Sequence, residues 1–194
     1  MIPKFLTALG VLGALLIAGC GTSDSPATSA STATGNPSDR AFVAQMIPHH
    51  QSAVQMATIA KRRATGAFVM QLADNIVRTQ TAEIATLRSA DQRLKAGGVK
   101  QGSLGVSEHM MGMDGDVSSL NTAKPFDAAF MRMMVPHHRG AVVMANAELK
   151  HGKDPALKTL ARNIISVQQR EISQMRTHLA STSKMGMHSA GHSG

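Results

Sequence analysis

The side chains best suited to chemistry in this chain are thioethers and imidazoles. Of its 194 residues, 14 are methionine and nine are histidine, whereas cysteine occurs once. Thioether sulfur and imidazole nitrogen suit soft and borderline metal ions such as Cu(I), whereas Mg²⁺ and Ca²⁺ prefer oxygen ligands. A single cysteine excludes a disulfide framework within the chain, a cysteine-based zinc site and an iron–sulfur cluster. The composition therefore favours a protein that binds a soft metal ion.

An internal repeat places these ligands in register. Residues 42–57 align without a gap with residues 130–145, which lie 88 positions later. Repeats of this kind indicate a duplicated structural unit. Both copies carry the pattern M-x-P-H-H-x2-A-V-x-M-A, which contributes Met46, His49, His50 and Met56 in the first copy and Met134, His137, His138 and Met144 in the second.

Each unit of the repeat has the pattern of two helices. Apolar residues recur at steps of three and four between residues 157 and 179, which is the helical period. Proline follows Asp154 at the start of that segment, and Gly97-Gly98 mark the end of an earlier one. Alternation typical of β-strands is absent from the sequence. We therefore expect an all-α protein, an up-down four-helix bundle built from two repeated hairpins, over residues 40–180 with a connector at 97–124.

Polar residues interrupt the apolar rows of the second and fourth helices. The carboxylates are Glu83 and Glu171, and each follows a glutamine by three residues. A buried carboxylate is costly unless it is paired, hydrogen-bonded or bound to a metal ion. A turn midway along the first hairpin would bring Met46 level with Glu83 and His49 level with Gln80. Imidazole, thioether, amide and carboxylate should thus converge in each unit, either at one central site or at two separate sites.

Two adjacent histidines on a helix point about 100° apart, so one metal ion should take only one of them. Met46 with either His49 or His50 would form such a chelate, and the other imidazole could hydrogen-bond the glutamate. The same residues without metal would be a structural cluster of His–Glu pairs and space-filling methionines. Duplication of the whole set favours the metal. Pro48 and Pro136 precede the histidines, so each helix should either begin near its proline or be kinked there.

Further methionines and histidines lie outside the expected bundle, in surroundings rich in glycine and serine. Such segments predict flexible arms that capture or transfer metal, although low-complexity drift could also produce them. The candidate residues are His109, Met110, Met111 and Met113 in the connector and Met185, Met187 and His188 in a tail at 181–194.

The N-terminus has the pattern of an export signal. Lys4 precedes an apolar stretch at 5–17, which is too short to span a bilayer, and small residues precede Cys20. This pattern resembles a bacterial lipoprotein signal over residues 1–19, with Cys20 lipidated; the alternative is an ordinary secretory signal in which Cys20 is incidental. Residues 20–39, which precede the first expected helix, contain no large apolar side chain, so they predict a flexible tether. We therefore expect an exported protein, lipid-anchored to a cell membrane and facing the periplasm or the cell exterior.

The paired M-x-P-H-H-x2-A-V-x-M-A motifs, each followed by a downstream Gln-x2-Glu, resemble the family called domain of unknown function 305 over about residues 39 to 180. The resemblance implies a ferritin-like helical bundle, usually exported, and some members of the family are implicated in copper binding and tolerance. The metal-site positions carried over onto this sequence are Met46, His49, His50, Met56, Glu83, Met134, His137, His138, Met144 and Glu171.

The function expected from these observations is that of a copper carrier or buffer rather than an enzyme, binding Cu(I) and by extension Ag(I) and exchanging it with other copper-handling envelope proteins. One alternative is a ferritin-like iron-dependent redox enzyme, but a di-iron site normally needs four carboxylates and Glu-x2-His patterns, and neither Glu83 nor Glu171 has a histidine three residues later. A second alternative is a metal-free helical interaction lipoprotein, whose polar row specifies helix register. Nucleic acid is not an expected partner, because the formal net charge of +8 is scattered and only 3% of residues are aromatic.

Overall fold

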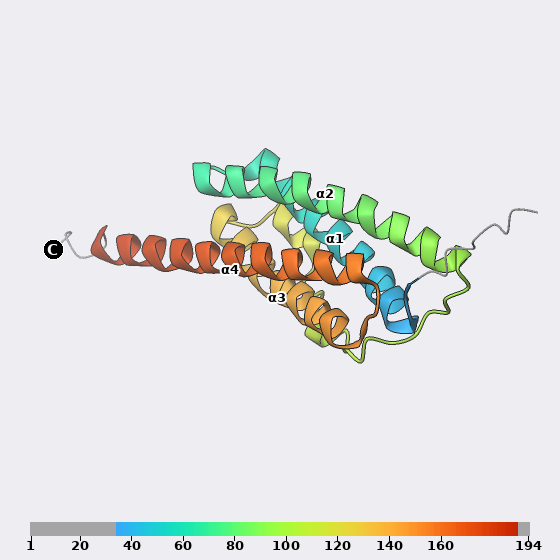
Figure 1. The fold of residues 1–194 in the computed structure, drawn as a ribbon. Coiled ribbons are helices and arrows are strands. Elements are labelled where there is room, and N and C mark those ends of the chain that lie inside the picture. Colours follow the sequence, from blue (N-terminus) through green and yellow to red (C-terminus); the bar gives the residue numbers. More distant parts are fainter. Residues whose placement is uncertain (1–33, 190–194) are drawn as a thin grey trace, which may run out of the picture. The chain divides into compact units, whose positions relative to one another are not determined.

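The computed structural model describes residues 34–189, and their side chains as far as residue 182. Within this range the chain forms helices and turns and no strand. The predicted signal at 1–19 and Cys20 lie outside the described residues. The four α-helices, shown in Figure 1, are α1 (Pro37–Arg63), α2 (Ala67–Ala96), α3 (Phe126–His151) and α4 (Pro155–Ser189). The predicted fold class, an all-α bundle of four helices, is confirmed.

The helices form two hairpins, α1 with α2 and α3 with α4, which meet mainly through α1 and α3. The start of α1 lies at the end of α3, where the Asn36 side-chain amide donates to the His151 carbonyl at 2.8 Å. The far end of α1 lies at the start of α3, where the Gly66 N–H donates to Asp127 at 2.7 Å. α1 and α3 are therefore antiparallel, and α2 and α3 run in the same direction. The predicted up-down order does not hold across the connector, because α3 does not reverse the direction of α2. This arrangement needs one long crossover, as in ferritin-like bundles.

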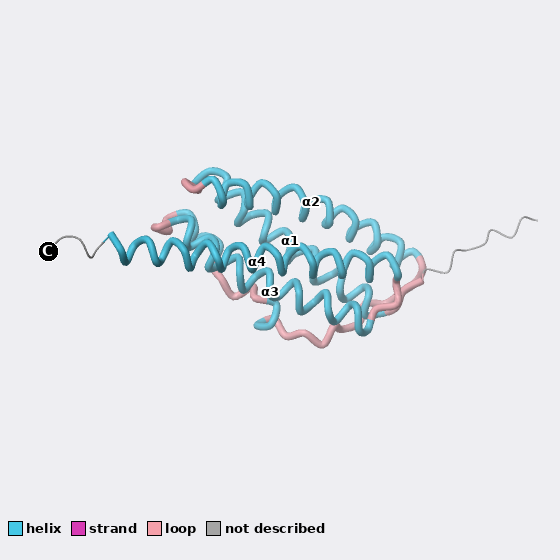
Figure 2. Tube along the Cα trace, turned by 60° about the vertical axis from the view of Figure 1, so that its left-hand side comes forward, coloured by secondary structure: helices cyan, strands magenta, loops and turns pink. Residues whose placement is uncertain are grey.

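The connector between α2 and α3 provides that crossover, visible as the long pink stretch in Figure 2. It contains two short 3₁₀ helices, η1 (His109–Met111) and η2 (Val117–Asn121). Its Gly102 N–H donates to the Pro37 carbonyl at 2.9 Å near the start of α1. The Arg63 guanidinium donates to carbonyls of the connector at the opposite end of α1. The connector differs from the flexible arm that was expected, because hydrogen bonds tie it to α1 and its Leu104 and Leu120 are buried, although its Met110 and Met113 are exposed.

The ends of the bundle differ from the predicted boundaries. α1 begins at Pro37, inside the tether expected at 20–39, because the Asn36 side chain accepts the N–H groups of Ser38 and Asp39 as a helix cap. α4 continues to Ser189 and does not stop at residue 180. Part of the expected tail at 181–194 is thus helical.

Both histidine-bearing helices continue through their prolines. α1 contains Pro48 and α3 contains Pro136 as interior residues. The alternative in which a helix begins at its proline is therefore wrong. Extensive burial of both helices compensates for the backbone bond that each proline removes.

Two apolar clusters fill the bundle, and each contains one methionine of the repeated motif from each hairpin. Met46 and Met144 belong to the cluster that includes Leu87, and Met56 and Met134 belong to the cluster that includes Met175. Small residues on the facing sides of α1 and α3 are fully buried, which lets the two backbones approach closely; they include Ala53, Ala57, Ala141 and Ala145.

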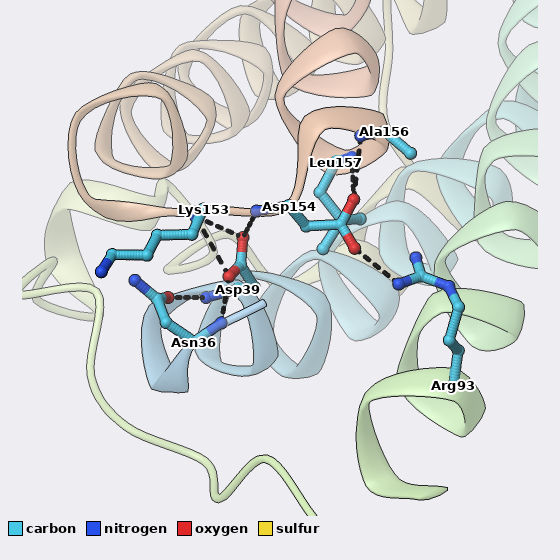
Figure 3. A network of polar contacts seen from close by, with 7 residues as sticks. All are labelled: Asn36, Asp39, Arg93, Lys153, Asp154, Ala156 and Leu157. Atoms are coloured by element: carbon cyan, nitrogen blue, oxygen red, sulfur yellow. Dashed lines mark hydrogen bonds and ion pairs between the residues drawn. The ribbon is translucent and has the colours of Figure 1, made fainter. Parts of the chain in front are cut away.

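A buried carboxylate ties the beginning of α1 to the beginning of α4 (Figure 3). Asp39 accepts the backbone N–H groups of Asn36, Lys153 and Asp154. Asp154 in turn accepts the Arg93 guanidinium of α2 at 2.6 Å and caps α4. Three helices are therefore fastened at this end, and the predicted start of the fourth helix at Asp154-Pro155 is confirmed.

Glu148 lies buried beside this network and supplies a pH-dependent prediction. Burial, followed by the neighbouring Asp39 carboxylate, raises its pKa from 4.5 to about 8. Between pH 4.5 and about 8, Glu148 is therefore protonated in the folded chain and ionised in the unfolded chain. Its contribution to the free energy of unfolding is highest below pH 4.5 and falls as pH rises through this window. In urea denaturation between pH 5 and 9, we expect the free energy of unfolding of the wild type to fall by about 1–2 kcal/mol more than that of Glu148→Gln. Glu108→Gln, on the exposed connector, is the control, and equal pH slopes for wild type and Glu148→Gln would contradict the prediction.

Candidate metal centre

Four imidazoles lie at the middle of α1 and α3, each 2% exposed or less. Two of them bind carboxylates. His50 Nε2 donates to Glu83 at 2.8 Å, and His138 Nε2 donates to Glu171 at 2.7 Å. One imidazole of each pair thus hydrogen-bonds the glutamate, as the sequence predicted.

The register of the hairpin differs from the predicted one. Glu83 meets His50, whereas the sequence placed Glu83 level with Met46 and His49 level with Gln80. The turn itself lies where it was assumed, near residue 65, because α1 ends at residue 63 and α2 begins at 67. The pairing therefore depends on which side chains face each other across the two helices, not on a displaced turn. Met46 consequently packs in the apolar cluster of Leu87, one turn further along α2.

The other two imidazoles meet each other. The ring centres of His49 and His137 are 3.8 Å apart and the ring planes are inclined by 33°. These residues are repeat equivalents, 88 positions apart, on two antiparallel helices. They therefore lie where the approximate twofold axis of the repeat crosses α1 and α3, and the two units share one central region.

Both central imidazoles are held neutral. Burial, followed by the adjacent His50, lowers the pKa of His49 to about 3. Burial, followed by His49, lowers the pKa of His137 well below its ordinary value. His49 Nε2 lies 2.9 Å from the Met111 carbonyl, an acceptor, so we assign the proton to Nε2. His49 Nδ1 is then an unprotonated nitrogen that has no hydrogen-bond partner among the described residues. Neutral imidazole is the form that binds metal ions.

His137 differs from the other three, because neither of its ring nitrogens has a partner in the part of the chain that the structure describes. It borders a pocket of about 360 Å³ between α1, α3 and the connector. Met56, Met113 and Met133 also line this pocket. Met133 was not among the predicted ligands. Its position four residues before His137 on a helix was a signal that could have identified it.

The remaining predicted ligands are dispersed. His109 is exposed and pairs with Asp114 at 2.9 Å, and Met110 is exposed on the same turn. Met111 packs against the cluster that contains Met46 and Met144. The side chains of Met185, Met187 and His188 lie outside the described residues.

The carboxylate side chains of the described residues do not come together as ligands for a hard metal ion. Among the described residues, no three His, Cys, Asp or Glu side chains form a group that could hold a metal ion. Glu83 and Glu171 each bind an imidazole instead. The iron-dependent alternative therefore lacks its ligand set in this range, whereas thioether and imidazole lie together at the central pocket.

These features define a class of protein: an all-α bundle with one long crossover and a centre of neutral imidazoles beside thioethers. The chain belongs to the family described as Domain of unknown function (DUF305), which it matches over residues 19–91 and 39–179.

Solved structures with the same fold include copper-bound proteins. The chain is 33% identical to CopM in its Cu(II)-bound form, with a TM-score of 0.64, covering 74% of this chain and 96% of CopM. CopM is also known in Cu(I)-bound and Ag-bound forms, at 31% identity. A secreted DUF305 protein from Streptomyces coelicolor is 29% identical, with a TM-score of 0.64, covering 75% of this chain and 92% of that protein.

A relative known from its sequence matches a smaller part of this chain. Over 53 residues, 27% of this chain, the sequence is 40% identical to the uncharacterized protein L153 of Acanthamoeba polyphaga mimivirus. The chain spans about a third of that protein's length, 35%. The described part of the chain contains no helix that is both long and apolar enough to cross a membrane.

Proposed function

We propose that this protein binds copper as Cu(I), and by extension Ag(I), outside the cytoplasmic membrane and serves as a carrier or buffer in copper tolerance. The observation that carries the proposal is the central pair of His49 and His137, buried and neutral, with nitrogens that no described residue satisfies. Buried polar atoms without partners are rare in folded proteins unless a ligand uses them. Soft donors next to these nitrogens favour a soft ion over Mg²⁺ or Ca²⁺.

The similarity to CopM supports copper in particular, because that protein binds Cu(I), Cu(II) and Ag in its solved forms at about the same level of identity. Placement outside the cytoplasmic membrane is proposed from the sequence pattern before Cys20, which would attach the protein to a membrane by lipid. The partners in this proposal are envelope proteins that deliver or accept copper.

Competition between the purified full-length chain and a coloured Cu(I) chelator tests this function. We expect the chain to retain Cu(I) against the chelator and to gain thermal stability, with Zn²⁺ and Mg²⁺ displacing none of the Cu(I). Complete transfer of Cu(I) to the chelator, together with an unfolding temperature unaffected by Cu(I) or Ag(I), would favour the metal-free interaction protein instead.

A further inference from the structure

The two hairpins carry different surface charge, although they repeat in sequence. On α1 and α2, several cations are paired with carboxylates. Lys61 pairs with Asp74 at 2.7 Å, and Asp91 pairs with both Arg40 and Lys95. In the described part of α3 and α4, by contrast, no lysine or arginine forms an ion pair with a carboxylate. The cations of the second hairpin are therefore available to an external anion.

The carboxylates of the second hairpin are turned away from solvent. Glu148 and Asp154 are buried, and Glu171 is bound to His138 at 2.7 Å. Asp127, at the start of α3, is partly buried and accepts backbone N–H groups of the turn between α1 and α2. The charge that this hairpin presents to solvent over its described residues is therefore positive.

The exposed cations form two neighbouring rows. On α3 they recur at steps of seven and eleven residues, and on α4 at a step of fourteen residues, so each row keeps to one face of its helix. Arg139 of α3 and Gln169 of α4 line the same hollow of about 400 Å³, which places the two rows side by side. The basic face of this hairpin consists of Arg132, Arg139, Lys150, Arg162 and Arg176.

The first hairpin provides an internal comparison for this face. The repeat-equivalent positions, 88 residues earlier, are Ala44, Gln51, Arg62, Asp74 and Arg88. Five cations on the second hairpin thus correspond to two cations, one carboxylate and two neutral residues on the first. Because both hairpins form the same pair of helices, the fold does not require these charges. The basic face is a property of the second hairpin alone.

An apolar side chain lies exposed within the basic face. Val143 is 37% exposed, between Arg139 and Lys150 along α3, and it lines the hollow together with Ile172. Its repeat equivalent on α1 is the polar Gln55. Cations around exposed apolar surface are typical of helices that lie on lipid headgroups, because the charges bind the anionic groups while the apolar side chain enters the interface.

The position of the tether favours a membrane over a soluble acidic protein as the partner of this face. The Asn36 side chain is bonded to the His151 carbonyl, so the chain enters the bundle beside the Lys150 end of the basic face. The 16 residues from Cys20 to Asn36 can span at most about 50 Å, whereas the 26 residues of α3 form a helix of about 39 Å. A lipid on Cys20 would therefore keep the whole face within reach of the bilayer.

We propose that the basic face of α3 and α4 docks on the anionic headgroups of a lipid bilayer, with Val143 at the level of the headgroups. The bundle would then lie with its second hairpin toward the membrane and its first hairpin toward solvent. The choice of a bilayer rests on the proposed placement outside the cytoplasmic membrane, whereas the contact itself requires neither copper nor the lipid on Cys20. Each exposed cation near an anionic bilayer adds to the attraction, and salt screens it.

Sedimentation of the full-length Cys20→Ser chain, which has no acylation site, with lipid vesicles tests this surface. We expect stronger binding to vesicles that are about a third phosphatidylglycerol than to vesicles of phosphatidylcholine alone, and loss of the difference at high salt. The triple variant Arg139→Gln, Lys150→Gln and Arg162→Gln should bind the anionic vesicles at least about 10-fold more weakly. The matched control removes three exposed cations of the first hairpin, Arg62→Gln, Arg78→Gln and Arg88→Gln, and should lose less than about threefold.

A fluorescent label reports which hairpin faces the bilayer. In the same Cys20→Ser background, an environment-sensitive dye on Val143→Cys should shift to shorter wavelength when anionic vesicles are added. The same dye on Gln55→Cys, the repeat-equivalent position of α1, should not shift. Equal shifts at the two positions would contradict docking through the second hairpin.

The outcomes separate this surface from the proposed copper function, since none of the substitutions touches the central imidazoles. Equal binding to neutral and anionic vesicles, or equal losses in the two triple variants, would overturn the membrane contact and leave Cu(I) retention as it is. Retention on immobilised polyglutamate without binding to anionic vesicles, lost only in the variant of the second hairpin, would overturn the bilayer in favour of an acidic protein. Urea denaturation checks that each variant folds with the wild-type stability.

Discussion

Replacement of His49 and His137 together by alanine should weaken the affinity of the protein for Cu(I) by at least about 100-fold, or roughly 2.7 kcal/mol. These two imidazoles are in contact, neutral and buried, and their Nδ1 atoms are without partners among the described residues. His50 and His138 also have an Nδ1 atom without a described partner, but their rings are tied to Glu83 and Glu171, whereas the contact between imidazoles of α1 and α3 is made by His49 and His137. Chelator competition measures the affinity, and the rise in unfolding temperature on adding Cu(I) should disappear in the double variant.

Controls for this experiment must separate lost ligands from lost packing. Alanine leaves a cavity at the centre of the bundle, so a second double variant, His49→Leu with His137→Leu, restores most of the volume. We expect the leucine variant to fold and still fail to retain Cu(I). His151→Ala, at the exposed end of α3, should bind as the wild type does. Unchanged Cu(I) affinity in the double alanine variant would remove the bundle as the copper site and leave only the methionine–histidine segments outside it.

The second large effect is expected at Gly140. A methyl group there would overlap the carbonyl group of Met111, which is backbone and cannot rotate away as a side chain could. We therefore expect Gly140→Ala to displace η1, break the bond between His49 and Met111, and lower the free energy of unfolding by about 2 kcal/mol, since overpacking exceeds the gain in helix propensity. Urea denaturation measures the stability. Limited proteolysis should show faster cleavage of the connector near residues 105–116.

The matched control is Ser52→Ala, which places the same alanine at the repeat-equivalent position of α1. Ser52 borders open space, so its replacement should change the stability by less than about 0.5 kcal/mol. A Gly140→Ala protein that is more stable than the wild type, with a connector no more sensitive to protease, would show that Met111 is not clamped at the centre.

Much of the fold could be predicted from the sequence, because the relevant physics is local. Helical periodicity, the Asp154-Pro155 start and the glycines after α2 specify helices and their ends through hydrogen bonding of neighbouring residues. The gapless repeat specifies two equivalent hairpins. It predicted that Met46 lies level with Glu83 and His49 level with Gln80, whereas Glu83 meets His50 although the turn lies where it was assumed.

The composition of the metal centre depends on contacts between distant segments, and these could not be predicted from local patterns. The sequence determined by itself that methionine, histidine and glutamate recur in register on helices. Only the tertiary structure decided that α1 and α3 run antiparallel, which brings His49 against His137. It also decided that the connector crosses the bundle beside them, where Met111 meets His49 and Met113 lines the pocket next to His137. The physical reason is that a crossover is selected by how well the two hairpins bury their apolar faces and by where a glycine lets backbone approach backbone, as Gly140 does for Met111.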